Sequence, residues 1–227
     1  MTYRSIWLRT EPATRTGRPA EWTREQITAA AVAVADGDGL GAVTMRRVAA
    51  RLGTGAASLY RYLETRDDLV DLMVDSVFGG FEHAPDSDDW RAGIVTDHMR
   101  QLQLMRDHPW LLDAIHARPP IGPNAGDVVE RTLARMANHP APGGRKLETV
   151  GVLAGMVQTY AANERPGGGV LDKDFVAVQA QLMQKTVSDG KHPHLAAALI
   201  DAASAPQDSP DDQLARALEL VLDGMLP

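Results

Sequence analysis

The sequence contains no cysteine, which excludes disulfide bonds and thiolate metal sites. Aromatic residues make up only 5% of the 227 residues, whereas alanine and leucine are abundant, and this composition favours helices. The longest apolar runs, at 27–35 and 195–200, are far shorter than the roughly 20 residues of a membrane-spanning helix. Near the N-terminus only Ile6 to Leu8 is apolar, too little for a signal peptide. We therefore expect a soluble, cytoplasmic protein without a metal site or other cofactor.

Charge is distributed unevenly along the chain, although the formal net charge at pH 7 is -7. Residues 1–70 carry ten arginines and eight acidic residues, a net +2, and the rest carries 13 basic and 22 acidic residues, a net -9. Residues 44–66 hold five arginines against one glutamate, a net +4. A basic patch on an otherwise acidic protein indicates a surface that meets phosphate groups.

The helix signals predict an all-α protein. Thr23 with Gln26, and Thr65 with Asp68, have the spacing of helix N-caps, and glycines at 37, 39 and 53 indicate helix ends. A Gly-, Pro- and Asp-rich segment at 78–89 suggests a hinge. We expect a flexible basic arm (1–21), an N-terminal three-helix domain followed by a linking helix (22–82), and a larger helical domain (83–227). The further helices are predicted at about 89–107, 110–117, 124–138, 145–165, 173–188, 194–203 and 211–225.

Two short helices, at 44–52 and about 56–63, are joined by a short turn containing Gly53, which is helix-turn-helix spacing. Arg46 and Arg47 lie in the first turn of one helix, and Arg66 directly follows the cap of the next. Cations oppose the dipole at a helix N-terminus unless phosphates bind there. Any one of these arginines is also compatible with ordinary solvated surface, but three together favour DNA binding.

The run from Val43 to Met73, VTMRRVAARLGTGAASLYRYLETRDDLVDLM, resembles the helix-turn-helix of the TetR family of transcriptional regulators without a gap. The features that carry the resemblance are Thr44, Val48-Ala49, Gly53, Leu59-Tyr60 with Tyr62, and Arg66 with Leu69. The resemblance implies phosphate contacts by Thr44, Tyr60 and Arg66, a guanine contact by Arg46, and a second helix in the major groove. The predicted DNA contacts are Thr44, Arg46, Arg47, Thr54, Ala56, Ala57, Ser58, Tyr60, Arg61, Tyr62 and Arg66.

Residues 106–136 resemble the C-terminal domain of the tetracycline-repressor-like branch of this family. The helix at 145–165 has one apolar stripe beside glycines at 151 and 155 that allow close approach, and the helix at 211–225 is polar only along one narrow strip. These patterns favour a homodimer through a four-helix bundle over core packing in a monomer. The predicted bundle residues are Leu147, Val150, Ala154, Val157 and Ala161 in the first helix and Leu214, Leu218, Val221, Leu222 and Met225 in the second.

The resemblance also implies a ligand pocket among the helices of the larger domain, with Tyr160 and Asn163 as its predicted polar anchors. The candidate lining residues are His98, Leu102, Met105, Trp110, Ile115, His116, Met136, Met156, Tyr160 and Asn163. Each of these residues is, alternatively, an ordinary core residue. His116 is displaced by two positions from the histidine that the tetracycline repressor uses, which argues against tetracycline itself.

We therefore interpret the chain as a sequence-specific DNA-binding regulator: a homodimeric repressor of a palindromic operator, released by a small-molecule effector. No P-loop, Gly-x-Ser-x-Gly or His-Glu-x-x-His motif is present, which argues against an enzyme. A nucleoid-type protein that binds DNA without sequence preference remains the alternative within DNA-binding proteins. The sequence also leaves open whether the arm contacts DNA and whether the chain represses or activates.

Overall fold

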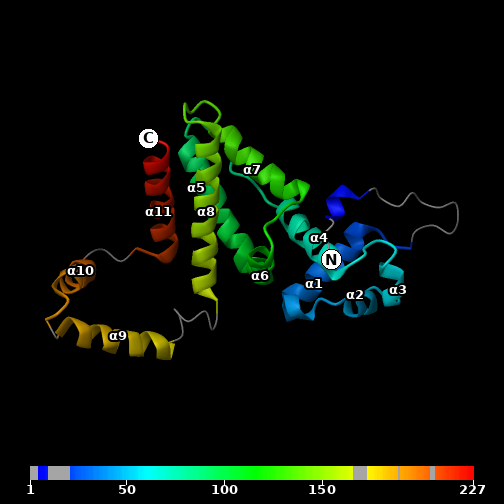
Figure 1. The fold of residues 1–227 in the computed structure, drawn as a ribbon, viewed down its shortest axis with the longest axis horizontal. Helices are drawn as coiled ribbons and strands as arrows, with labels where there is room; N and C mark the ends of the chain where they lie inside the picture. Colours follow the sequence, from blue (N-terminus) through cyan, green and yellow to red (C-terminus); the bar gives the residue numbers. More distant parts are fainter. Residues whose placement is uncertain (1–4, 10–20, 166–172, 189, 205–207) are drawn as a thin grey trace.

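The computed structural model describes residues 5–9, 21–165, 173–188, 190–204 and 208–227, and these residues form helices and no strand. The all-α prediction is confirmed. In chain order the elements are η1 (Ile6–Leu8), α1 (Arg24–Asp38), η2 (Leu40–Ala42), α2 (Met45–Arg51), α3 (Ala56–Leu59), α4 (Arg66–Gly79), α5 (Trp90–Asp107), α6 (Trp110–Ala117), α7 (Pro123–Arg135), α8 (Gly143–Glu164), α9 (Lys173–Ser188), α10 (Pro193–Ser204) and α11 (Pro210–Met225) (Figure 1).

Local capping accounts for where the first helices begin. The Thr23 hydroxyl accepts from the Gln26 N–H and the Gln26 side chain accepts from the Thr23 N–H, and Thr65 and Asp68 repeat this arrangement at α4. Both predicted capping boxes are confirmed, because they depend only on residues three apart. The third helix is shorter than predicted: α3 ends at Leu59, and residues 60–62 form turns.

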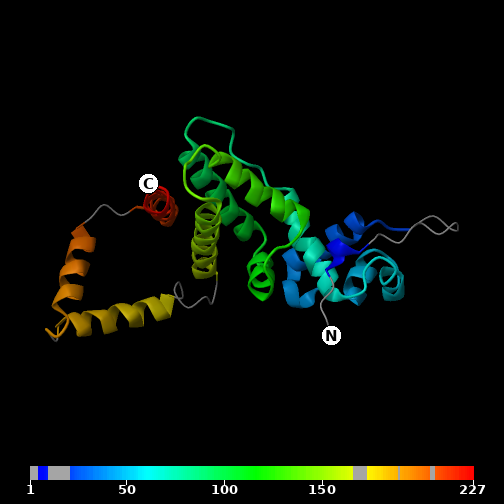
Figure 2. The same ribbon diagram turned by 45° about the horizontal axis from the view of Figure 1, so that its top comes forward.

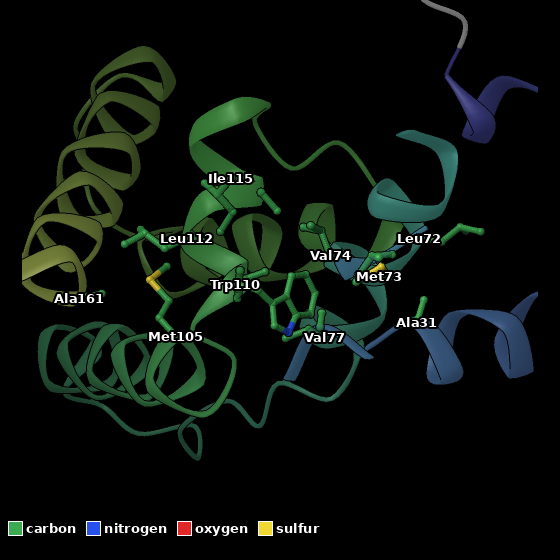
Figure 3. Packing of buried hydrophobic residues seen from close by; sticks show 14 of the residues in the cluster. Ala31, Leu72, Met73, Val74, Val77, Met105, Trp110, Leu112, Ile115 and Ala161 are labelled. Carbon is green, nitrogen blue, oxygen red and sulfur yellow. The ribbon is translucent and has the colours of Figure 1, made fainter. Parts of the chain in front are cut away.

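The helices form two parts, which we call the head (α1 to α4) and the body (α5 to α8 and α11) (Figure 1). One continuous core joins them: in Figure 3, Val77 of α4 and Trp110 of α6 lie between Ala31 of α1 and Met105 of α5. Helices α9 and α10 stand away from the body in both Figure 1 and Figure 2. No helix in the described part of the chain is long and apolar enough to cross a membrane.

The prediction of a flexible N-terminal arm is wrong for residues 5–9. Ile6 is only 2% exposed within the core, and the Arg9 guanidinium donates to both carboxylate oxygens of buried Asp68 at 2.8 and 2.9 Å. A short apolar island therefore packs because the head offers it a surface that the local sequence does not reveal. The other arginines of the predicted arm, Arg4, Arg15 and Arg18, lie outside the described residues.

The predicted assignment of apolar faces in α8 and α11 is also partly wrong. Leu218 has no exposed surface, and it is buried within its own protomer together with Leu214, Leu222, Val157 and Ala161. Leu147, a predicted bundle residue, is 54% exposed, and further apolar surface stays free on neighbouring faces, where Val152 is 43% and Leu220 is 67% exposed. A Cβ built at Gly151 or Gly155 meets nothing within 4 Å, so the protomer leaves this side of α8 open to close approach.

Candidate DNA-binding surface and ligand cavity

The helix-turn-helix is a rigid unit within the head. Val48 and Ala49 of α2 are buried with Leu59 of α3, so the two helices share one small core. The turn between them depends on Gly53, whose φ of +72° lies in the left-handed region that favours glycine. The Thr54 N–H donates to the Ala49 carbonyl at 2.9 Å and closes the turn. The geometry of the unit therefore follows from its own sequence.

Most of the predicted DNA contacts are available at the surface of this unit. Arg46 is exposed and, among the described residues, makes no hydrogen bond or ion pair. Tyr60 is 55% exposed, and Arg61 lies beside the Tyr62 ring with its guanidinium carbon 5.9 Å from the ring centroid. Exposed residues in the predicted set are Thr44, Arg46, Arg47, Ala57, Tyr60, Arg61 and Arg66, and half-buried ones are Thr54, Ala56, Ser58 and Tyr62.

Three predicted contacts have partners in the head that lie nine or more residues away. Arg66 donates to the carbonyls of Leu40 and Val43, both at 2.7 Å, and so ties the start of α4 to η2. The Tyr62 hydroxyl accepts from the Trp22 N–H at 3.3 Å. Arg47 forms an exposed ion pair with Asp38 at 2.5 Å. These partners are distant in sequence, which is why residue type and spacing did not predict them.

A cavity of about 240 Å³ lies in the body. Helices α4 to α8 contribute to its wall, together with Pro120 from the connection between α6 and α7. The lining residues are Phe78, His98, Gln101, Met105, Ile115, Pro120, Ala125, Val128, Val129, Thr132, Val150, Gly151, Ala154 and Gln158. None of these side chains carries a formal charge at neutral pH. The wall is therefore mostly apolar with a few polar groups, which is typical of small-molecule pockets.

Only three of the predicted pocket residues, His98, Met105 and Ile115, line this cavity. The others lie elsewhere: Leu102, Trp110 and Met136 are at most 2% exposed within the core, and His116 faces solvent. On α8 the cavity wall is the face of Val150, Gly151, Ala154 and Gln158. Met156, Tyr160 and Asn163 do not line it, so the predicted polar anchors are not brought to this cavity. Sequence reasoning missed Gln101 and Gln158, whose positions no motif marks.

His98 is the most deeply buried polar group of the cavity wall, with 1% of its surface exposed. Its Nδ1 lies 2.8 Å from the Ile94 carbonyl oxygen, which is only an acceptor, so Nδ1 carries the hydrogen. Burial lowers the pKa of His98 and outweighs the opposing effects of that hydrogen bond and of Asp97. At neutral pH His98 is therefore an uncharged imidazole whose Nε2 is an acceptor.

Helix α6 connects the cavity wall to the head at both of its ends. At its start, the Trp110 indole N–H and His108 Nδ1 meet the same carboxylate oxygen of Asp36 on α1, at 2.6 and 2.7 Å. At its end, Arg118 forms ion pairs with Asp67 at 2.8 Å and Asp71 at 3.2 Å, both on α4. A displacement of α6 therefore acts directly on two helices of the head.

Helix α4 reaches the cavity itself through Phe78. A second contact fixes α4 to the start of α7, where Asp75 accepts from the Ala125 N–H at 3.1 Å and from the Asn124 side chain at 2.9 Å. Burial raises the pKa of Asp75 despite these hydrogen bonds. One end of α4 thus adjoins the helix-turn-helix and the other adjoins the cavity.

Comparison with known proteins agrees with this arrangement. Residues 27–73 match the family model of "Bacterial regulatory proteins, tetR family", and residues 82–227 match "Tetracyclin repressor-like, C-terminal domain". The chain belongs to the TetR family. Regulators of this family bind operator DNA as dimers and respond to small-molecule effectors, and this chain is one of these transcriptional regulators.

Individual relatives cover most of the chain. It is similar to the HTH-type transcriptional repressor DrrR1 of Streptomyces coeruleorubidus, with 34% identity over 212 residues, 89% of this chain and 77% of the relative. An HTH-type transcriptional regulator of Saccharopolyspora erythraea is 38% identical over 134 residues, 59% of this chain and 56% of the relative. The crystal structure of apo ActR from Streptomyces coelicolor matches with a TM-score of 0.75 and 25% identity, covering 90% and 95% of the two chains. ActR in complex with actinorhodin matches with the same TM-score and identity over 91% and 96%.

Proposed function

We propose that this regulator is a repressor that binds a palindromic operator as a homodimer and releases it when a small molecule occupies the cavity of the body. The observation that carries the proposal is the placement of α4 and α6: α4 belongs to the head and reaches the cavity through Phe78, and α6 lines the cavity and contacts α1 and α4. The proposal assigns no catalytic activity to the chain and locates it in the cytoplasm. It also assigns DNA binding to residues 22–82 and ligand binding with dimerisation to residues 83–227.

Two related proteins support the repressor and effector parts of this proposal. DrrR1 is named a transcriptional repressor, and ActR has been solved with actinorhodin bound. For a ligand to release DNA it must bind the released state more tightly than the DNA-bound state, because equal binding to both shifts nothing. In this chain Phe78 on α4 and Ile115 on α6 supply contacts that change if either helix moves.

The exposed faces of α8 and α11 support a dimer interface. Val152 and Leu220 are large apolar residues in solvent, and the surface around Gly151 and Gly155 is open. Pairing these faces with those of a second copy would bury them in a four-helix arrangement. A two-fold symmetric pair of heads would then meet the two half-sites of a palindrome in successive major grooves.

Fluorescence anisotropy tests this function with a labelled duplex from the DNA upstream of the gene that encodes this chain. The proposal predicts at least about a thousandfold tighter binding than to a scrambled duplex. 1-Naphthol, an uncharged aromatic alcohol, is the first probe to test and should release the DNA. Equal affinity for both duplexes would contradict the proposal.

A matched pair of α8 variants tests the site of the effector. Ala154→Trp fills the cavity and should abolish 1-naphthol binding, measured by titration calorimetry. Thr159→Trp, an exposed position on the same helix, should leave that binding unchanged. Loss of binding in both variants, or in neither, would contradict the placement of the effector in the cavity.

A further inference from the structure

The cavity wall carries a polar corner on α5. His98 and Gln101 are three residues apart, which makes them neighbours on the surface of a helix, and both line the cavity. Their side chains are 1% and 8% exposed. His98 uses its Nδ1–H on the Ile94 carbonyl, and the Gln101 amide has no hydrogen-bond partner among the described residues. Buried polar groups are normally paired, so this corner lacks hydrogen-bond partners that a ligand can supply.

The hydrogen-bonding capacity of the corner is specific. Since Nδ1 carries the hydrogen of the neutral imidazole, Nε2 can only accept. A ligand group at Nε2 must therefore donate. The Gln101 amide can both donate and accept. Its N–H can therefore donate to the oxygen of a group whose own hydrogen is donated to His98 Nε2. A hydroxyl group satisfies both side chains at once.

Charge narrows the ligand class further. No Asp, Glu, Lys or Arg lines the cavity. A carboxylate ligand would meet the lone pair of His98 Nε2 without a cation nearby, and an ammonium ligand would be buried without an anion. An unpaired charge in an apolar cavity is costly, so the cavity disfavours both. Thr132 does not change this, because its hydroxyl donates to the Val128 carbonyl at 3.0 Å and leaves only acceptor capacity.

We infer that the effector of this regulator is an uncharged, largely apolar small molecule that places a hydroxyl group between His98 and Gln101. The hydroxyl donates to His98 Nε2 and accepts from the Gln101 amide, while Phe78, Met105 and Val128 contact its apolar part. This inference rests on the proposed function, because it takes the cavity as the effector site. It adds the chemical class of the effector and the two side chains that select it.

Three naphthalene probes separate the relevant properties: 1-naphthol has the hydroxyl, 1-methoxynaphthalene has the oxygen without the donor, and 1-naphthoate carries a negative charge. Titration calorimetry on the full-length protein at pH 7.5 should show 1-naphthol binding about three- to tenfold more tightly than 1-methoxynaphthalene, the effect of one net hydrogen bond. Binding of 1-naphthoate should be undetectable. Equal affinity for the two uncharged probes would overturn the hydroxyl assignment and leave the cavity as a ligand site.

Two substitutions test which residue causes the preference for 1-naphthol over 1-methoxynaphthalene. His98→Phe removes the acceptor at similar size and should abolish the preference for 1-naphthol, whereas the same change at exposed His116 should retain it. Gln101→Leu breaks no hydrogen bond within the described protein. It should weaken the binding of both 1-naphthol and 1-methoxynaphthalene while retaining the preference for 1-naphthol. A preference that survives His98→Phe would overturn the role of His98.

Nitrogen NMR of the wild-type protein with 15N-labelled histidine gives a readout that does not depend on the folding of a variant. One histidine should show an unprotonated Nε2 whose resonance shifts on addition of 1-naphthol and not on addition of 1-methoxynaphthalene. A protonated Nε2 in the free protein would overturn the inference. If none of the three probes binds, the inferred ligand class is wrong. DNA binding, measured on the same preparation, tests the proposed function separately.

Discussion

Arg46 differs from Arg47 and Arg66 in having no hydrogen-bond or ion-pair partner among the described residues. Arg47 pairs with Asp38, and Arg66 donates to two backbone carbonyls of the η2 segment. An exposed guanidinium in the first turn of α2 opposes the helix dipole and gains no compensating contact from the protein. We propose that a DNA base edge or phosphate supplies the partner of Arg46.

Arg46→Ala is therefore expected to weaken binding to the selected operator by ~1–3 kcal/mol and to relax specificity at one base pair in each half-site. The loss on random DNA should be much smaller, because only the specific complex contains the base contact. Competition binding with single-base operator variants measures both effects. Arg131→Ala, an exposed arginine on α7, is the control and should change neither. An equal loss on operator and random DNA would show that Arg46 contacts only the backbone.

Asp68 makes the stability of the head depend on pH. Burial alone would raise the pKa of its carboxyl, but the hydrogen bonds from Arg9 and from the Thr65 and Glu64 N–H groups outweigh burial, and the net pKa is lowered. A carboxyl with a lowered pKa in the folded state stabilises the fold above its unfolded pKa of about 3.9. That contribution is lost as the pH falls through the lower, folded-state pKa.

Arg9→Met is expected to reduce the free energy of unfolding at pH 7 by ~1–3 kcal/mol, because it leaves a buried carboxylate with fewer partners. The difference from wild type should shrink as the pH falls through the lowered pKa of Asp68, because below that pKa the carboxyl is protonated in both proteins. Urea denaturation at a series of pH values measures it. Arg131→Met removes an exposed ion pair with Asp86 and should cost much less. A deficit that does not change with pH would contradict the Arg9–Asp68 account.

Whether the sequence predicts the role of a single residue depends on how far away in the sequence its partner lies. Thr23, Thr44 and Thr65 cap helices as predicted, because their partners are three residues away. Trp110 was predicted to line the pocket, but its indole N–H is used by Asp36, 74 residues earlier in the chain. No local pattern reveals such a partner.

Among the elements, α6 connects the body to the head at both of its ends. Trp110 in its first turn donates a hydrogen bond to Asp36 of α1. Arg118, which follows its last residue, forms ion pairs with Asp67 and Asp71 of α4. Between these two ends, Ile115 lines the cavity. Coupling between two sites requires an element whose position both sites influence. These contacts give α6 that property.

Asp36→Ala is expected to reduce the effect of 1-naphthol on operator affinity by about three- to tenfold, since it removes the contacts of Trp110 and His108 with α1. The affinity for 1-naphthol itself should change little. Operator titrations with and without saturating 1-naphthol give the ratio. Asp113→Ala, which breaks the ion pair of α6 with Arg165 but leaves the head contacts intact, is the control. An unchanged ratio in Asp36→Ala would show that the signal passes through α4 alone.

Helix α8 shows why the sequence predicted the pocket helices but not the pocket residues. The helix was expected at 145–165 and is observed at Gly143–Glu164, because its apolar periodicity is unambiguous. It has three apolar faces, however: one buried with Leu153 and Val157, one at the cavity with Val150 and Ala154, and one in solvent with Val152. Periodicity places residues on a common face, but which neighbour each face meets depends on the packing of the whole body.

At the scale of the whole molecule, the exposed apolar residues and the charge distribution both fit a dimer that pairs through its body and binds DNA through its heads. Leu220 on α11 and Val152 on α8 are exposed apolar residues of the body, which monomeric proteins usually avoid clustering. The first 70 residues carry a net charge of +2 and the rest -9, so phosphate attracts the end that bears the helix-turn-helix and repels the other. The molecule is therefore suited to pair through its body and to meet DNA through its head.

Leu220→Glu is expected to raise the dimer dissociation constant at least tenfold while leaving the protomer folded, because it places a charge in the interface but not in the core. Analytical ultracentrifugation measures the dissociation constant, and circular dichroism checks the fold. Leu218→Glu, two residues away but fully buried, should instead unfold the protomer. A Leu220→Glu protein that remains dimeric with wild-type affinity would contradict the proposed interface.

Selection of duplexes from a random pool by the purified, full-length protein tests the central claim most directly. A sequence-specific dimer should enrich a palindrome whose half-sites lie a whole number of helical turns apart, because two equivalent helix-turn-helix units must enter the major groove on the same side of the DNA. Arg46→Ala protein should enrich a site that is degenerate at one position of each half. A pool that stays random while the protein binds it tightly would contradict this account, and would identify the chain as a DNA-binding protein without sequence preference.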